Sequence, residues 1–222
     1  MIYRFFDVFL SSVSLILLSP LFLIVCIVLR CTGEREVFFY QSRVGKKGKL
    51  FNLFKFATML KDSPNLGTGT VTLKNDARVL PFGYYLRKSK INELPQLLNI
   101  LKGDMSIIGP RPQTVRCFEA FPKAYQLKII TVKPGLSGIG SIIFRNEENL
   151  LNNSNSPSHF YDKVIMPFKG SLEDWYVSHL SIWTYFTLIF LTIWVVIFPK
   201  SKLVWRLFIS LPKPPKDISK HI

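Results

Sequence analysis

The sequence predicts a membrane-associated protein of mixed α and β structure, in which a hydrophobic helix precedes one compact, helix-rich unit. Three observations support this prediction. Residues 8–29 form a 22-residue run without a charged side chain. The chain carries a net charge of +15, although 48% of its residues are hydrophobic. Between this run and a second apolar run near the C-terminus, short aromatic-rich runs, turns and a leucine-rich helical pattern follow one another.

The combination of positive charge and hydrophobicity indicates a partner that is both anionic and apolar. A bilayer with acidic head groups meets both conditions. Nucleic acid meets only the first, so we expect no nucleic-acid partner. The three cysteines and three histidines are scattered, without a spacing typical of metal ligands or of a disulfide framework.

The first apolar run is long enough to span ~30 Å of hydrocarbon. It exceeds the ~7–15 apolar residues of a signal peptide, and residues 30–35 (RCTGER) make a poor cleavage site. Ser19 and Pro20 lie near its middle, and proline removes one helix hydrogen bond, so we expect a kink there. A kinked helix either spans the bilayer or dips in and returns to the same side.

The second apolar run, residues 180–198, carries aromatic side chains that suit a membrane interface. Residues 30–179 hold 22 basic and 12 acidic side chains, and residues 199–222 hold 6 and 1. The positive-inside tendency places both basic segments in the cytoplasm. This favours a second run that lies in or dips into the membrane over one that crosses it. We therefore divide the chain into a membrane helix (1–30), a cytoplasmic domain (31–179) and a membrane-associated segment with a basic tail (180–222).

In the middle unit, residues 36–40 (EVFFY) and 50–56 (LFNLFKF) predict two strands joined by a turn at residues 43–49. The lysines of this turn either form a solvated hairpin tip or contribute to a site. The polar, Gly- and Thr-rich residues 62–76 predict a loop.

Residues 86–112 are the most informative stretch. Asn92 is a good N-cap for a helix whose leucines recur at core spacing and which Gly103 ends. Arg87, Lys88 and Lys90 precede this helix start, and Arg111 follows in a Gly-Pro-Arg-Pro turn. Cations that converge on a helix start predict a phosphate site, where an acidic residue would also suit a divalent metal ion.

Residues 91–112, INELPQLLNILKGDMSIIGPRP, resemble the signature of the bacterial sugar transferases, the monotopic polyprenyl-phosphate phosphoglycosyl transferases. Further matching segments are RFFD at 4–7, FYQSRVG at 39–45, KFATM at 55–59, NDAR at 75–78 and VKPGLSG at 132–138. In order and spacing, the resemblance covers roughly residues 1–195.

The resemblance implies an α/β catalytic core with interfacial amphipathic helices, behind a re-entrant helix broken at Ser19 and Pro20. Both ends of that helix would lie on the cytoplasmic face of the bacterial inner membrane, in contact with membrane lipid. The implied reaction moves a sugar-1-phosphate from a nucleotide sugar, of the UDP type, to polyprenyl phosphate. It starts the assembly of a surface polysaccharide or glycan and uses Mg²⁺. The resemblance also leaves room for a homodimer.

The resemblance assigns Glu93 as a catalytic residue that binds the metal ion or acts as an acid–base group. The adjacent catalytic position, where the family has an aspartate nucleophile, is Asn92. For phosphate binding we rank Arg87 and Arg111 first, because each matches a motif arginine. The further phosphate-binding candidates are Arg43, Lys55, Arg78 and Arg145, of which Arg145 is either a phosphate ligand or an ion-pair partner of Glu147 or Glu148.

The asparagine at position 92 leaves open which group attacks the donor phosphate, because a neutral amide is a poor nucleophile. Glu93 can attack instead, the lipid phosphate can attack directly, or another carboxylate can reach the site. The other carboxylates considered are Asp76, Asp104, Glu147 and Glu148. Two rival interpretations are a catalytically impaired membrane scaffold of a glycan assembly complex and a basic anchor for anionic lipid. We take an active enzyme centred on Glu93 as the working hypothesis.

Overall fold

The computed structural model describes residues 2–66, 76–145, 147–152 and 156–219, without the side chains at positions 64, 148, 149 and 152. Most of the predicted loop at 62–76 therefore lies outside the described residues. The helices are α1 Ile2–Cys31, α2 Pro81–Lys88, α3 Gln96–Lys102, α4 Val115–Glu119, α5 Lys123–Ile129, α6 Ile139–Ile143, α7 Glu147–Asn152, α8 Pro157–Phe160, α9 Met166–Ser178, α10 Ile182–Ile197 and α11 Leu203–Leu207. The strands are β1 Phe38–Val44, β2 Leu50–Phe56, β3 Ser106–Ile108 and β4 Gly135–Ser137.

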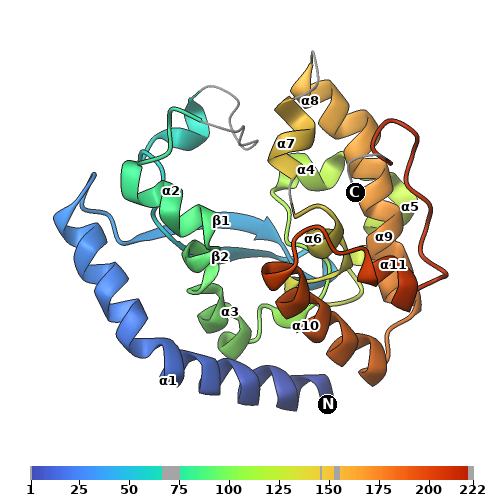
Figure 1. The fold of residues 1–222 in the computed structure, drawn as a ribbon, viewed down its shortest axis with the longest axis horizontal. Helices are drawn as coiled ribbons and strands as arrows, with labels where there is room; N and C mark the ends of the chain where they lie inside the picture. Colours follow the sequence, from blue (N-terminus) through green and yellow to red (C-terminus); the bar gives the residue numbers. More distant parts are fainter. Residues whose placement is uncertain (1, 67–75, 146, 153–155, 220–222) are drawn as a thin grey trace.

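The strands form two small sheets. β1 pairs with β2 antiparallel, and β3 pairs with β4 parallel. Figure 1 shows the β1–β2 hairpin near the centre, α1 bordering one side and α9 to α11 covering the other. A long apolar N-terminal helix and a helix-rich core with little sheet are therefore confirmed.

The helix α1 is long, apolar and bent. Among the described residues, it is the one helix long and apolar enough to cross a membrane, and only 11% of its most apolar 18-residue window is buried. Figure 1 shows that it changes direction partway along its length. Pro20 lies inside α1 and has no N–H to donate to the carbonyl of Ile16. Ser19 Oγ donates to that carbonyl instead, at 2.8 Å, so the serine compensates for the bond that the proline removes.

The polar residues of the first turns of α1 fasten it to the core. Asp7 is only 2% exposed, and its Oδ1 accepts hydrogen bonds from Ser106 Oγ at 2.8 Å and from the Ile107 N–H at 2.9 Å. The Tyr185 hydroxyl of α10 donates to the same oxygen at 2.8 Å. One carboxylate oxygen thus joins α1, β3 and α10.

Arg4 makes a second attachment. Its guanidinium donates to the carbonyls of Ile100 and Leu101, at the C-terminal end of α3. The Ile100 carbonyl also accepts the Gly103 N–H, and the negative end of the helix dipole favours a cation at these last carbonyls. The same α1 turn therefore holds both α3 and β3.

The hairpin differs from the prediction in its first strand. Strand β2 has the predicted bounds, whereas β1 runs over Phe38–Val44 and not over 36–40, because the register pairs Phe38 with Phe56 and Val44 with Leu50. The lysine side chains of the turn are exposed. Its backbone is nevertheless anchored, since the Lys47 N–H donates to the Ile130 carbonyl at 2.7 Å.

The prediction that Asn92 is a helix N-cap is wrong. Residues Ile91–Glu93 form a separate 3₁₀ turn that follows Lys90, whose backbone is left-handed, and α3 begins only at Gln96. Pro95 stands at the cap position of α3, where its missing N–H costs the helix no hydrogen bond. Gly103 ends α3 with φ +99°, as predicted.

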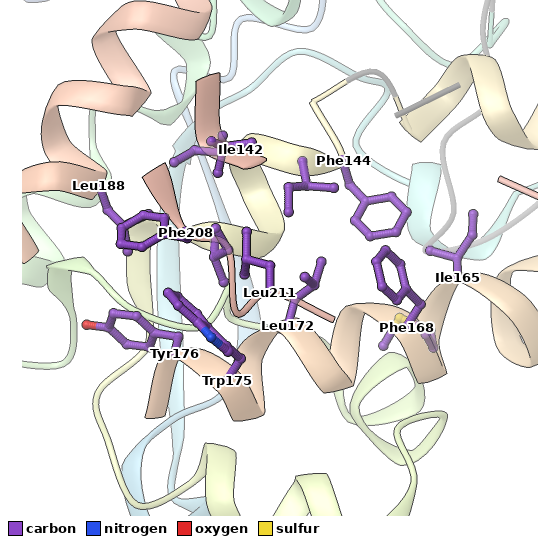
Figure 2. Close-up of a cluster of buried hydrophobic side chains, with 14 of the residues drawn as sticks. Ile142, Phe144, Ile165, Phe168, Leu172, Trp175, Tyr176, Leu188, Phe208 and Leu211 are labelled. Atoms are coloured by element: carbon purple, nitrogen blue, oxygen red, sulfur yellow. The ribbon is translucent and has the colours of Figure 1, made fainter. Parts of the chain in front are cut away.

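The largest core cluster lies around α9. Figure 2 shows side chains from α6, α9, α10 and the C-terminal segment converging, and the Phe144 ring lies edge-on to the Phe168 ring. Trp175 packs edge-on against Phe208, and Ile218 near the C-terminus is fully buried. The C-terminal segment therefore belongs to the same core as α9.

The helix α10 has one buried and one exposed apolar face. Its 16 residues span about 24 Å at ~1.5 Å per residue, which is less than the ~30 Å thickness of hydrocarbon. Tyr185, Leu188 and Leu191 are buried in the core, while Trp183 is 72% exposed. The helix itself is therefore shorter than the hydrocarbon layer, and the prediction that this segment lies in or dips into the membrane stays a prediction.

Candidate active site around Glu93

Four separate elements bring the predicted polar residues together. Lys55 lies near the end of β2, Glu93 in the 3₁₀ turn, and Arg111 in the loop after β3. Arg43 lies in β1 and donates to the Pro112 carbonyl at 3.1 Å, so it braces the same loop. The hairpin, the turn and the loop thus meet at one place.

Glu93 is the anionic centre of this cluster. Arg111 Nη2 donates to Glu93 Oε1 at 2.8 Å, and Lys55 Nζ lies 3.8 Å from the same oxygen. The side chain of Glu93 is 13% exposed, so solvent screens these interactions only weakly. Arg111, in contrast, is 32% exposed and reaches towards solvent.

The charges perturb one another strongly. Burial would raise the pKa of Glu93, but the charges of Arg111, Lys55 and Lys90 outweigh it and hold that pKa well below its usual range. Burial lowers the pKa of Lys55 to about 7, and Arg43 and Arg111 add to this effect. Burial and Arg111 lower the pKa of Arg43 to about 10. Three cations face one carboxylate, so the cluster has an excess of positive charge that an anion would offset.

Arg87 borders the cluster. Its Nη1 lies 3.7 Å from Met59 Sδ, and its charge contributes to lowering the pKa of Lys55. The structure therefore brings together Glu93, Arg111, Lys55, Arg43 and Arg87 from the predicted set.

Asn92 is buried beside Glu93, and among the described residues its Oδ1 has no hydrogen-bond partner. No group of three His, Cys, Asp or Glu side chains in the described chain is arranged to hold a metal ion. Mg²⁺, however, usually takes one or two protein oxygens and completes its shell with phosphate oxygens and water. The Glu93 carboxylate and the unpaired Asn92 oxygen fit that requirement.

The predicted phosphate ligand Arg78 is engaged by other groups, whereas the role of Arg145 stays a prediction. Arg78 Nε and Nη2 both donate to Asp76, and its Nη1 donates to the carbonyls of Ser63 and Leu66. We therefore assign Arg78 to fastening Ser63 and Leu66 to the segment that begins at Asp76. Arg145 makes no ion pair with any side chain that the structure describes, and Glu147 pairs with Lys169 instead. The side chain of Glu148 lies outside the described residues.

The alternative carboxylates are engaged as well. Asp76 is paired with Arg78 at 2.6 Å. Asp104 lies 3.4 Å from Asn99 Nδ2 and 3.5 Å from Lys102 Nζ, which fits a structural role in the turn after α3. Glu147 lies 2.7 Å from Lys169 Nζ.

Sequence reasoning missed the polar residues that α9 contributes. Lys169 and Glu173 are 2% and 1% exposed, and burial raises the pKa of Glu173 to about 7. Glu173 Oε1 accepts the backbone N–H of Arg111 at 3.3 Å. Tyr161 begins a π-helical turn, Tyr161–Ile165, and is buried near Arg43. The available signal was the i, i+4 spacing of Lys169 and Glu173, which puts both on one face of the helix.

Comparison with known proteins places this geometry in context. Residues 1–199 match the family model described as "Bacterial sugar transferase". The exopolysaccharide production protein ExoY of Rhizobium meliloti is 37% identical over 158 residues, which cover 65% of this chain and 70% of ExoY. The galactosyl transferase CpsE of Streptococcus agalactiae is 31% identical, with 87% of this chain and 42% of CpsE covered. A Klebsiella pneumoniae protein named UDP-glucose:undecaprenyl-phosphate glucose-1-phosphate transferase is 33% identical, with 89% and 40% covered. The chain thus spans less than half the length of the last two relatives.

Proposed function

Because the chain belongs to the bacterial sugar transferase family, we propose that it transfers a sugar-1-phosphate from a UDP-sugar to undecaprenyl phosphate. The names of the relatives from Klebsiella pneumoniae and Aeromonas hydrophila support these two substrate classes. In the proposed reaction an oxygen of the acceptor forms a bond to the phosphorus that carries the sugar. The bond from that phosphorus to the oxygen bridging the two phosphates breaks, which releases the nucleoside monophosphate. The lipid-linked product would start the assembly of a surface glycan.

The observation that carries this proposal is the excess of positive charge around Glu93. Arg111 lies 2.8 Å and Lys55 3.8 Å from the Glu93 carboxylate, and Arg43, which braces the Arg111 loop, adds its charge to theirs. Phosphoryl transfer is catalysed mainly by groups that offset the charge on the transferred phosphoryl oxygens. Guanidinium groups suit this task because they bind phosphate oxygens in a fixed, two-pronged geometry.

We propose that the lipid phosphate attacks directly. Asn92 is neutral, and Glu93 Oε1 already receives Arg111 and Lys55, whose charges hold its pKa low and weaken it as a nucleophile. A phosphate monoester dianion needs no protein base in order to attack. Glu93 then serves to orient Arg111 and Lys55 towards the phosphoryl group.

We further propose that Mg²⁺ takes part, held by Glu93 and by Asn92 Oδ1. When bound, it would offset charge on the two phosphates of the donor. The acidic and amide oxygens of these adjacent residues are the kind of ligand that Mg²⁺ prefers.

For the location, we propose the cytoplasmic face of the bacterial inner membrane, with α1 as a re-entrant helix. The exposed apolar surface of α1 and the net charge of +15 both suit a bilayer with anionic head groups. The bend of α1 and the Ser19 bond to Ile16 would return the chain to the face from which it entered (Figure 1).

Replacing the proline tests this topology. In Pro20→Ala the new N–H can donate to the Ile16 carbonyl, so we expect α1 to straighten to about 45 Å, at ~1.5 Å per residue over its 30 residues, and to cross the bilayer. A cysteine placed at position 2, with the native cysteines replaced, should then be labelled by impermeant maleimide from outside spheroplasts. Leu17→Ala, a change at an exposed position of the same helix, should leave the label inaccessible from outside. External labelling of the protein that keeps Pro20 would contradict the proposal that α1 is a re-entrant helix.

Asn92 tests the chemical route. Purified protein with UDP-sugar donors and undecaprenyl phosphate is expected to release UMP, and donor alone should leave the intact mass unchanged, since no covalent step is proposed. In Asn92→Asp we expect a phosphosugar adduct with donor alone, because a carboxylate can form an acyl phosphate. An adduct on the unmodified protein would contradict direct attack. If the unmodified protein were silent with every donor while Asn92→Asp was active, the impaired scaffold would be the better interpretation.

A further inference from the structure

Two prolines give the loop that carries Arg111 an unusual backbone. Between Gly109 and Gln113, only Arg111 has an N–H group, because Pro110 and Pro112 have none. That N–H donates to Glu173 Oε1, 62 residues further along the chain. A buried N–H without a partner would be costly, so this single bond matters to the loop.

Glu173 is built into its position from several sides. It is 1% exposed, and its Oε2 has no hydrogen-bond partner among the described residues. Gly140 of α6 lies directly against it, since a Cβ atom there would lie 2.4 Å from Glu173 Oε1. The absence of a side chain at position 140 is therefore what admits the carboxyl group.

The neighbouring polar residues of α9 act on adjacent segments. Lys169, one turn earlier, pairs with Glu147 at 2.7 Å and lies 5.0 Å from the Phe144 ring centre. Tyr176, one turn later, donates its hydroxyl to the Ile108 carbonyl at 3.1 Å, just before the Arg111 loop. This face of α9 thus contacts the backbone of the Arg111 loop and of the strand before it, while Glu93 binds the Arg111 guanidinium.

We propose that Glu173 is a positioning residue for Arg111. Its carboxyl oxygen fixes the backbone of Arg111 and thereby sets the direction in which the guanidinium reaches Glu93 and the transferred phosphoryl group. This proposal rests on the proposed function for its kinetic consequence, but the hydrogen bond itself is independent of it. The acceptor oxygen is what the role requires, so glutamine serves as well as glutamate and leucine does not.

Steady-state kinetics test this role. Glu173→Leu keeps the volume but removes the acceptor, and we expect kcat to fall about 10–100-fold with KM for the donor changed less than threefold, because a misplaced catalytic group costs mainly the transition state. Glu173→Gln should restore kcat to within threefold of the unmodified protein. Ser171→Ala, which removes a hydroxyl that donates to the Phe168 carbonyl within α9, is the matched control and should also stay within threefold.

Hydrogen exchange separates this proposal from the proposed function. The Arg111 amide stands alone between two prolines, so the difference between overlapping peptides that end on either side of residues 110–112 gives its exchange. We expect it to exchange about tenfold faster in Glu173→Leu than in Glu173→Gln, whether or not the protein turns over any donor. Equal exchange in the two variants, or equal kcat, would overturn the positioning role. If Glu173→Leu does not fold, Gly140→Ala displaces the same carboxyl group, and unchanged Arg111 exchange in that variant would overturn it as well.

Discussion

Glu93→Gln is expected to lower kcat about 10²–10³-fold, the size of effect seen when one preorganised charge is removed from an active site. The amide keeps the shape of the side chain but loses the charge that holds Arg111 at 2.8 Å and Lys55 at 3.8 Å. Without that charge, the pKa of Lys55 should fall further below its present value of about 7, since Glu93 is the group that raises it. The lysine would then be largely neutral at neutral pH and could no longer offset phosphoryl charge.

The effect on KM should distinguish this role from simple binding. Glu93 is an anion beside an anionic donor, so at saturating Mg²⁺ its removal should leave KM for the donor unchanged or lower. The measurement is UMP release at varied UDP-sugar concentration with saturating acceptor. Glu119→Gln, which removes an exposed carboxylate on α4, is the control and should not alter either constant. A kcat within threefold of the unmodified protein in Glu93→Gln would show that the site is not centred on Glu93.

Asp7→Ala is expected to destabilise the fold by about 3–5 kcal/mol, because three buried donors lose their common acceptor. The donors are the Ser106 hydroxyl, the Ile107 N–H and the Tyr185 hydroxyl. In detergent or nanodiscs, this should appear as a Tm lower by about 10 °C for a chain of this size.

Asp7→Asn is the matched control for that prediction. All three donors converge on Oδ1, and asparagine keeps an oxygen at that position, so its Tm should lie within a few degrees of the unmodified protein. A Tm change below 2 °C in Asp7→Ala would show that water or a local shift replaces the carboxylate. If Asp7→Asn lowered the Tm as much as Asp7→Ala, the stabilisation would come from the charge of Asp7 and not from its hydrogen bonds.

The parts of the fold that could be predicted are those with a local cause. The apolar run of α1, strand β2 and the end of α3 at Gly103 follow from hydrophobic patterning and backbone freedom, which neighbouring residues determine. The start of α3 was misplaced because Lys90 adopts a left-handed backbone, which lysine rarely does and no sequence pattern announces. The bounds of β1 were misplaced because its partner strand determines them.

The residues of the site were also predicted only in part. Glu93, Arg111, Lys55, Arg43 and Arg87 do come together, and the motif they belong to made that expectation possible. Arg78 does not join them, because Asp76 lies two residues away and captures its guanidinium. Glu173 was missed since its partner is a backbone N–H, and such a contact depends on how α9 packs and not on any residue near Arg111 in sequence.

The prolines on both sides of Arg111 have a thermodynamic consequence. Each fixes its own φ, and the residue before each is restricted as well, so the loop has little conformational freedom even before the chain folds. Little entropy then remains to be lost when a diphosphate arrives. Binding of the donor should accordingly be rigid-body in character, with a modest entropic penalty in calorimetry and few changes in the order of this loop.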